Sequence, residues 1–320
     1  MATPNWDLLS KNHIPGRDWA SIRNVWSAAS IGFDPMQIDD LSDAVEPIIG
    51  PDFEKRDNVS VIEFPGRHVA AFHDAAAALL KCAYVLRTVG NCLLGGQPTW
   101  ASVDAYHFSF LAGRTVLAFL GIHLVHIKDS FCVLDVFPEG ATTQEVTKFK
   151  KINPSTSEPA RLIFRNRSTP IEQRAIWTVL VRAIRVASFS PEIDKDVDKI
   201  CDLGDGFGRS RNELLYRNST WLYQEDYQQP TRSVSINDDI HSYSDLAEFF
   251  AQQRDANFAF AAIFARVLVV LASDIQKQSG VNLLKTSYAP RLSKFSGFNV
   301  PGLDTLFSSV YRKEGYGIDL

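Results

Sequence analysis

The sequence contains only four cysteines, and no two of them form a Cys-x-x-Cys pair: Cys82, Cys92, Cys132 and Cys201. A disulfide-stapled fold or a structural zinc site would need cysteines, or cysteines and histidines, at short regular spacings. We therefore expect reduced, mostly buried thiols in a cytoplasmic protein, with no metal ion and no cofactor.

Long apolar runs are also missing. The longest, FAFAAIFARVLVVLA at residues 258–272, is shorter than the roughly 18 residues of a membrane-spanning helix and contains Arg266. The first residues, MATPNWDLLSKNH, hold no basic stretch followed by an apolar core, so no secretory signal is expected. We interpret residues 258–272 as a buried core helix, and we expect no membrane partner.

Positive charge is not in excess. Lys and Arg together number 33 and Asp and Glu 37, which gives a formal net charge of -4. The surface as a whole therefore lacks the basic character of a general nucleic-acid binder, and any such contact must come from a local patch. With 320 residues, 45% of them hydrophobic, the chain can form one large domain or two ordinary ones around a sizeable core.

Helical periodicity is what the sequence does contain. Segments rich in Ala and Leu and free of proline predict long helices at residues 68–94 and 102–120, with Ser102 as the N-cap and Gly121 as the stop. Further helices are predicted at 170–189, at 208–224 and from 244 to about 279. Residues 123–140 alternate with a period of two, which predicts a hairpin that turns near residues 128–130.

These elements predict a mostly α fold, a helical bundle of about five main helices with a small inserted β-hairpin. Closely spaced prolines and glycines mark residues 1–65 as an irregular N-terminal segment, with short helices expected at 18–27 and 39–49. A helical domain is expected at 66–280, with a hairpin and loop insertion at about 123–169. Residues 281–320 are expected to form a tail that packs on this domain.

The segment GRSRNELLYRNSTWLYQ, at residues 208–224, concentrates the residues best suited to chemistry. On a helical wheel Arg209 and Tyr216 share one face, with Asn212 at its edge, while leucines occupy the other face. The guanidinium of an arginine stays charged and offers a planar fork of donors, which suits phosphate. This helix is either a ligand or assembly site, or a structural helix with a polar face.

A second polar stretch, residues 148–167, interleaves basic residues with Phe149 and Phe164. Cationic and aromatic side chains in alternation can contact the backbone and the bases of a single strand. The alternative is an ordinary solvated loop. The candidate nucleic-acid-binding residues are Lys148, Lys150, Lys151, Arg165 and Arg167.

Two of these stretches resemble the HEPN superfamily of helical-bundle domains over roughly residues 66–280. The first is VDAYHFSFLAGRTVLAFLGIHLV, in which the family pattern falls on Tyr106, His107, Phe110, Ala112, Arg114, Leu117 and Gly121. The second is RNELLY, in which Arg211-Asn212 matches the Arg-polar half of the motif of a later helix. Tyr216 stands where that motif has a histidine.

The resemblance implies a homodimer or a subunit of a larger complex, possible contact with RNA, and a toxin or antiviral-defence setting. Active members are similar to metal-independent ribonucleases that use the Arg and His of two subunits. Carried onto this sequence, the catalytic candidates are Arg211, Asn212, Tyr216 and Arg209, with His107 and Arg114 in supporting roles.

Tyr216 is the point at which this sequence departs from the family. A tyrosine has an unperturbed pKa near 10 and is a poor base at neutral pH. No histidine lies between His126 and His241 to take its place. We therefore favour a non-catalytic, regulatory or assembly subunit. The alternatives are a metal-independent ribonuclease that uses an Arg-Asn…Tyr motif, and a helical scaffold without any link to nucleic acid.

Overall fold

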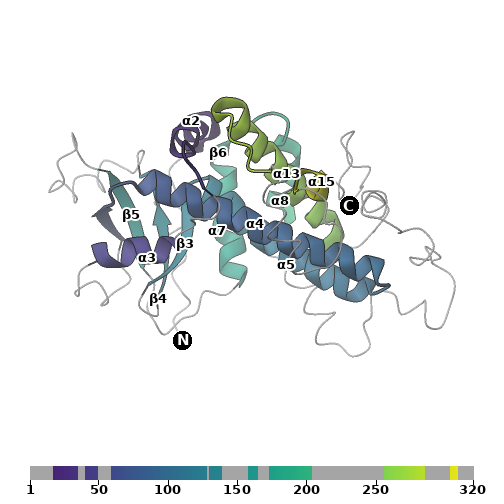
Figure 1. The fold of residues 1–320 in the computed structure, drawn as a ribbon. Helices are drawn as coiled ribbons and strands as arrows, with labels where there is room; N and C mark the ends of the chain where they lie inside the picture. The colour runs from purple at the N-terminus through teal and green to yellow at the C-terminus, as the bar shows by residue number, and fades with distance from the viewer. Residues whose placement is uncertain are drawn as a thin grey trace. The chain divides into compact units, whose positions relative to one another are not determined.

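The structure is a computed structural model, and it describes residues 17–34, 40–49, 59–127, 130–138, 158–164, 173–203, 256–284 and 303–308. Within them the helices are α2 (Trp19–Ala29), α3 (Leu41–Val45), the short 3-10 helix η1 (Glu46–Ile48), α4 (Arg67–Leu94), α5 (Pro98–Phe119), α7 (Gln173–Arg185), α8 (Asp194–Leu203), α13 (Ala256–Ser279) and α15 (Leu303–Ser308) (Figure 1). The strands are β1 (Arg17–Asp18), β2 (Val59–Glu63), β3 (Ile122–Ile127), β4 (Ser130–Asp135), β5 (Pro159–Phe164) and β6 (Ala187–Ser188).

This inventory confirms the mostly α class, with a correction to the number of helices. The described residues contain eight α-helices rather than about five. Helices α2 and α3 lie where the sequence predicts short helices, at 18–27 and 39–49, and α8 and α15 are further short helices. A helix as short as α15 has too few turns for a clear period in the sequence.

The chain divides into two compact units. Unit 1 comprises residues 1–78, 114–191 and 274–281, and unit 2 comprises residues 79–113, 192–273 and 282–320. All six strands belong to unit 1, together with α2, α3 and α7, whereas α8 and α15 belong to unit 2. Helices α4, α5 and α13 contribute residues to both units.

A four-stranded antiparallel sheet organises unit 1, in the order β2-β5-β4-β3. The β3–β4 pair confirms the predicted hairpin, because Ile127 pairs with Ser130 across a connection of two residues. Helix α3 lies against β3 (Figure 1). The sheet is larger than the predicted hairpin because β2 pairs with β5, which lies about a hundred residues further along the chain, and local patterning cannot show such a pairing.

The turn between α4 and α5 corrects one boundary. Gly96 has a φ of 67°, and the backbone N–H of Gln97 donates to the carbonyl of Cys92 at 2.8 Å. Proline fits the first turn of a helix, and α5 accordingly begins at Pro98 rather than after Ser102. Ser102 therefore lies inside the helix, where its buried hydroxyl accepts a hydrogen bond from the Asn257 side chain at 2.9 Å.

Gly121 ends α5 as predicted. Its φ of 77° is a left-handed conformation that glycine adopts without strain, and its carbonyl accepts from the backbone N–H of Val136 at 3.0 Å. A Cβ at this position would lie 2.1 Å from the ring of Phe137. The close approach of β4 to the end of α5 therefore requires a residue without a side chain.

Aromatic rings fill the core of unit 1 around Trp26, whose side chain is fully buried. The indole N–H donates to the carbonyl of Phe119 at 2.7 Å, so the one polar atom of the ring is satisfied. The rings of His68, Phe72 and Phe137 lie 5.2–6.4 Å from it, centroid to centroid. Helix α2 is thereby fixed to α4 and to the end of β4.

Helix α13 confirms the predicted core helix in its described part. Two helices of the described residues, α4 and α13, are long and apolar enough to cross a membrane by length and composition. In the apolar window of α13, 83% of the residues are buried inside the protein, as expected for a core helix. Residues 244–255, where the sequence places the start of this helix, lie outside the described residues.

Candidate functional site

Most of the sequence-predicted site lies outside the described residues. The four catalytic candidates fall within residues 204–255: Arg209, Arg211, Asn212 and Tyr216. The basic candidates fall within residues 139–157 and 165–172: Lys148, Lys150, Lys151, Arg165 and Arg167. These assignments stay predictions. The structure describes the two supporting residues, His107 and Arg114, and both lie on α5.

Most of the accessible positions of helix α5 follow one stripe. Beyond its first two residues, which are half-buried, Trp100 is 53% exposed and the half-buried positions are 104, 107, 110, 111 and 114. Residues 100, 104, 107, 111 and 114 follow one another at spacings of four, three, four and three, so their side chains fall within about 80° of the helix circumference. Such 4-3 spacing marks the seam along which one helix contacts another.

We call Trp100, Asp104, His107 and Leu111, which all belong to unit 2, the α5 stripe. The imidazole Nδ1 of His107 lies 3.8 Å from Oδ1 of Asp104, and their side chains are 41% and 26% exposed. At this distance and exposure the pair adds little to stability. Both groups therefore remain available to a partner.

Cys92 of α4 borders the stripe. Its thiol donates to Oδ2 of Asp104 at 3.7 Å. Burial, followed by the charge and the hydrogen bond of Asp104, raises the pKa of the Cys92 thiol to about 11. Burial alone raises the pKa of Cys132, on β4, to about 12. Neither thiol forms a nucleophilic thiolate at neutral pH.

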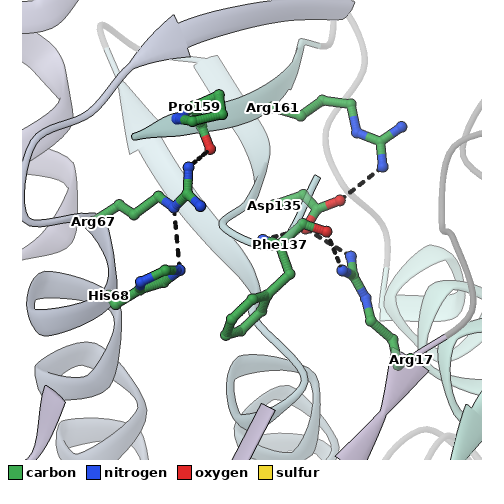
Figure 2. Close-up of polar contacts among 7 residues, drawn as sticks. All are labelled: Arg17, Arg67, His68, Asp135, Phe137, Pro159 and Arg161. Atoms are coloured by element: carbon green, nitrogen blue, oxygen red, sulfur yellow. Dashed lines mark hydrogen bonds and ion pairs between the residues drawn. The ribbon is translucent and has the colours of Figure 1, made fainter. Parts of the chain in front are cut away.

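Unit 1 holds a buried ion cluster of Arg17, Asp135 and Arg161, from β1, β4 and β5 (Figure 2). One carboxylate oxygen of Asp135 lies 2.6 Å from Arg17 and the other lies 2.7 Å from Arg161. The three side chains are only 1–4% exposed. Two cationic groups thus share one carboxylate out of contact with water.

The hydrogen bonds of this cluster make it structural. Asp135 also accepts from the backbone N–H of Phe137 at 2.9 Å, and Arg17 donates to the carbonyl of Phe137. The Asp135 carboxylate thus accepts three hydrogen bonds, two of them from arginines, and each of its oxygens is engaged within the fold. The cluster ties β1 to the end of β4 and to β5.

Arg67 and His68 occupy the neighbouring space, at the start of α4 (Figure 2). The Arg67 guanidinium donates to the imidazole Nε2 of His68 at 3.1 Å and to the carbonyl of Pro159. The His68 ring stacks on Phe137, with centroids 5.0 Å apart and planes 21° apart. His68 is therefore engaged in packing and in the link between α4 and β5.

His123 of β3 and Asp74 of α4 form a part-buried acid–imidazole contact in unit 1. The Asp74 carboxylate lies 2.7 Å from Nδ1 of His123, so Nδ1 carries the proton of this hydrogen bond. The imidazole is fully buried, and its Nε2 has no hydrogen-bond partner within the described chain. No substrate can reach that nitrogen without an opening of the core. His126, three residues on, is exposed, as the alternation of a strand predicts.

An ion pair of a different kind links two helices of unit 2. Arg266 of α13 lies 3.4 Å from the carboxylate of Asp196 of α8, and it also donates to the carbonyl of Glu192 at 3.2 Å. Burial raises the pKa of Asp196, and the nearby charges of Arg266 and Lys199 offset only part of this effect. Among the described residues no three His, Cys, Asp or Glu side chains converge as metal ligands.

Comparisons with family models, with curated proteins and with solved structures find no match to this chain.

Sequence reasoning missed the ion cluster and the stripe for different reasons. Arg17 and Asp135 are 118 residues apart, and nothing local to either residue signals their contact. The 4-3 spacing along α5 could have been read from the sequence. What the sequence could not provide is which side of a helix rich in apolar residues stays accessible, because packing decides that.

Proposed function

We propose that this protein is a HEPN-like helical protein that acts as a non-catalytic, regulatory or assembly subunit in an RNA-associated or defence system. The α5 stripe is the observation that carries the proposal. Helix α5, which bears the family-like pattern, is buried at most of its positions outside the stripe. Its accessible residues include His107. A single stripe with apolar and charged members on a core helix is suited to contact a partner helix.

The state of the reactive groups supports a role without catalysis. The thiols of Cys92 and Cys132 stay protonated at neutral pH. The carboxylate of Asp135 accepts three hydrogen bonds within the fold, and the imidazole of His123 is fully buried. Tyr216, at the position of the family's histidine, is a weak base by its chemistry.

Incubation with RNA tests the proposal against its alternative. Purified protein is mixed with labelled total RNA and with tRNA, with and without EDTA, beside Arg211→Ala, Tyr216→Phe and the control Lys277→Gln. We expect intact RNA in every sample. Cleavage that resists EDTA, persists in the control and disappears in both motif variants would overturn the proposal and establish a metal-independent ribonuclease.

The association with RNA has its own measurement, the salt dependence of binding. Each cation that neutralises a phosphate of single-stranded RNA contributes about 0.7 to the slope of log affinity against log salt. Replacement of Lys148, Lys150 and Lys151 by glutamine should therefore make this negative slope shallower by about 2. An unchanged slope would remove these lysines from the proposed RNA contact.

A further inference from the structure

We draw no further inference here: the strongest candidate, the exposed apolar side chains of Leu94 and Trp100 at the turn between α4 and α5, lies on a surface for which nothing in the structure shows what covers it.

Discussion

The ion cluster of unit 1 and the α5 stripe of unit 2 both place an aspartate beside basic partners, yet the two aspartates have opposite surroundings. Asp135 is 4% exposed and lies 2.6 and 2.7 Å from two arginines. Asp104 is 26% exposed and lies 3.8 Å from a single imidazole. Asp135 is thus buried and held by close ion pairs, whereas Asp104 is partly accessible and has a longer contact with its imidazole partner.

Because of this difference, the two aspartates should contribute differently to the stability of the fold and to contacts with a partner. A buried ion pair that loses one partner leaves an uncompensated charge in a medium of low dielectric constant, which is strongly unfavourable. A half-exposed pair contributes little to the free energy of unfolding, because water solvates its members when they separate. The cluster should therefore determine whether unit 1 folds, and the stripe should determine what the folded protein contacts.

The largest expected effect is that of Asp135→Ala. The variant leaves Arg17 and Arg161 buried without the carboxylate that they share, which should lower the free energy of unfolding by about 3–5 kcal/mol in urea titrations. The exposed Asp198→Ala, on α8, serves as the control and should stay within about 0.5 kcal/mol of the wild type. A loss of less than about 1 kcal/mol for Asp135→Ala would contradict the structural role of the cluster.

The second effect is the loss of stability when a methyl group is placed against the ring of Phe137, which lies beside the cluster. Gly121→Ala requires a left-handed backbone conformation and also places a methyl group 2.1 Å from Phe137. Gly32→Ala has a similar φ of 80° but meets nothing within 4 Å. The backbone term, roughly 1–2 kcal/mol, is common to both variants, and the clash should add about 1–3 kcal/mol to Gly121→Ala alone. Equal unfolding free energies for the two variants would show that Phe137 moves aside without cost.

The third effect concerns Asp196, a buried carboxylate whose ion pair with Arg266 offsets only part of the effect of burial on its pKa. Burial raises the pKa of Asp196 in the folded protein above its ordinary value of 3.8, so the native state holds its proton at pH values where the unfolded chain has released it. The stability that this proton contributes is complete below about pH 3.8 and is lost as the pH rises through the folded-state pKa.

Asp196→Asn keeps the side chain neutral at every pH and isolates this contribution. The stability of the variant relative to the wild type should rise between pH 4 and pH 7 in paired urea titrations. A relative stability that falls over this range would mean that the pairing with Arg266 outweighs burial and lowers the pKa.

The smallest effect concerns the stripe. The charge and the hydrogen bond of Asp104 both contribute to the raised pKa of the Cys92 thiol, after burial. Asp104→Asn removes the charge, so the pKa of Cys92 should fall and its rate of reaction with a thiol reagent at pH 8 should increase. The Cys92→Ser variant identifies the labelled site. An unchanged rate would show that burial alone controls this thiol.

The sequence predicts the helices and strands of this molecule better than it predicts the contacts between them. The Ala- and Leu-rich period of α4, the stop at Gly121 and the β3–β4 hairpin are local patterns, and the structure has all three. The pairing of β2 with β5 and the contact of Arg17 with Asp135 join residues about a hundred positions apart, so no local pattern reveals them. The motif with Arg211 and Tyr216 stays a prediction.

One measurement tests the separation of the two regions most directly: the urea midpoint of His107→Ala, determined beside those of Asp135→Ala and the wild type. We predict an unchanged midpoint for His107→Ala, because the imidazole is half-exposed and its contact with Asp104 adds little to stability. A midpoint lowered as far as that of Asp135→Ala would contradict the account, since His107 would then hold its own chain together as Asp135 does.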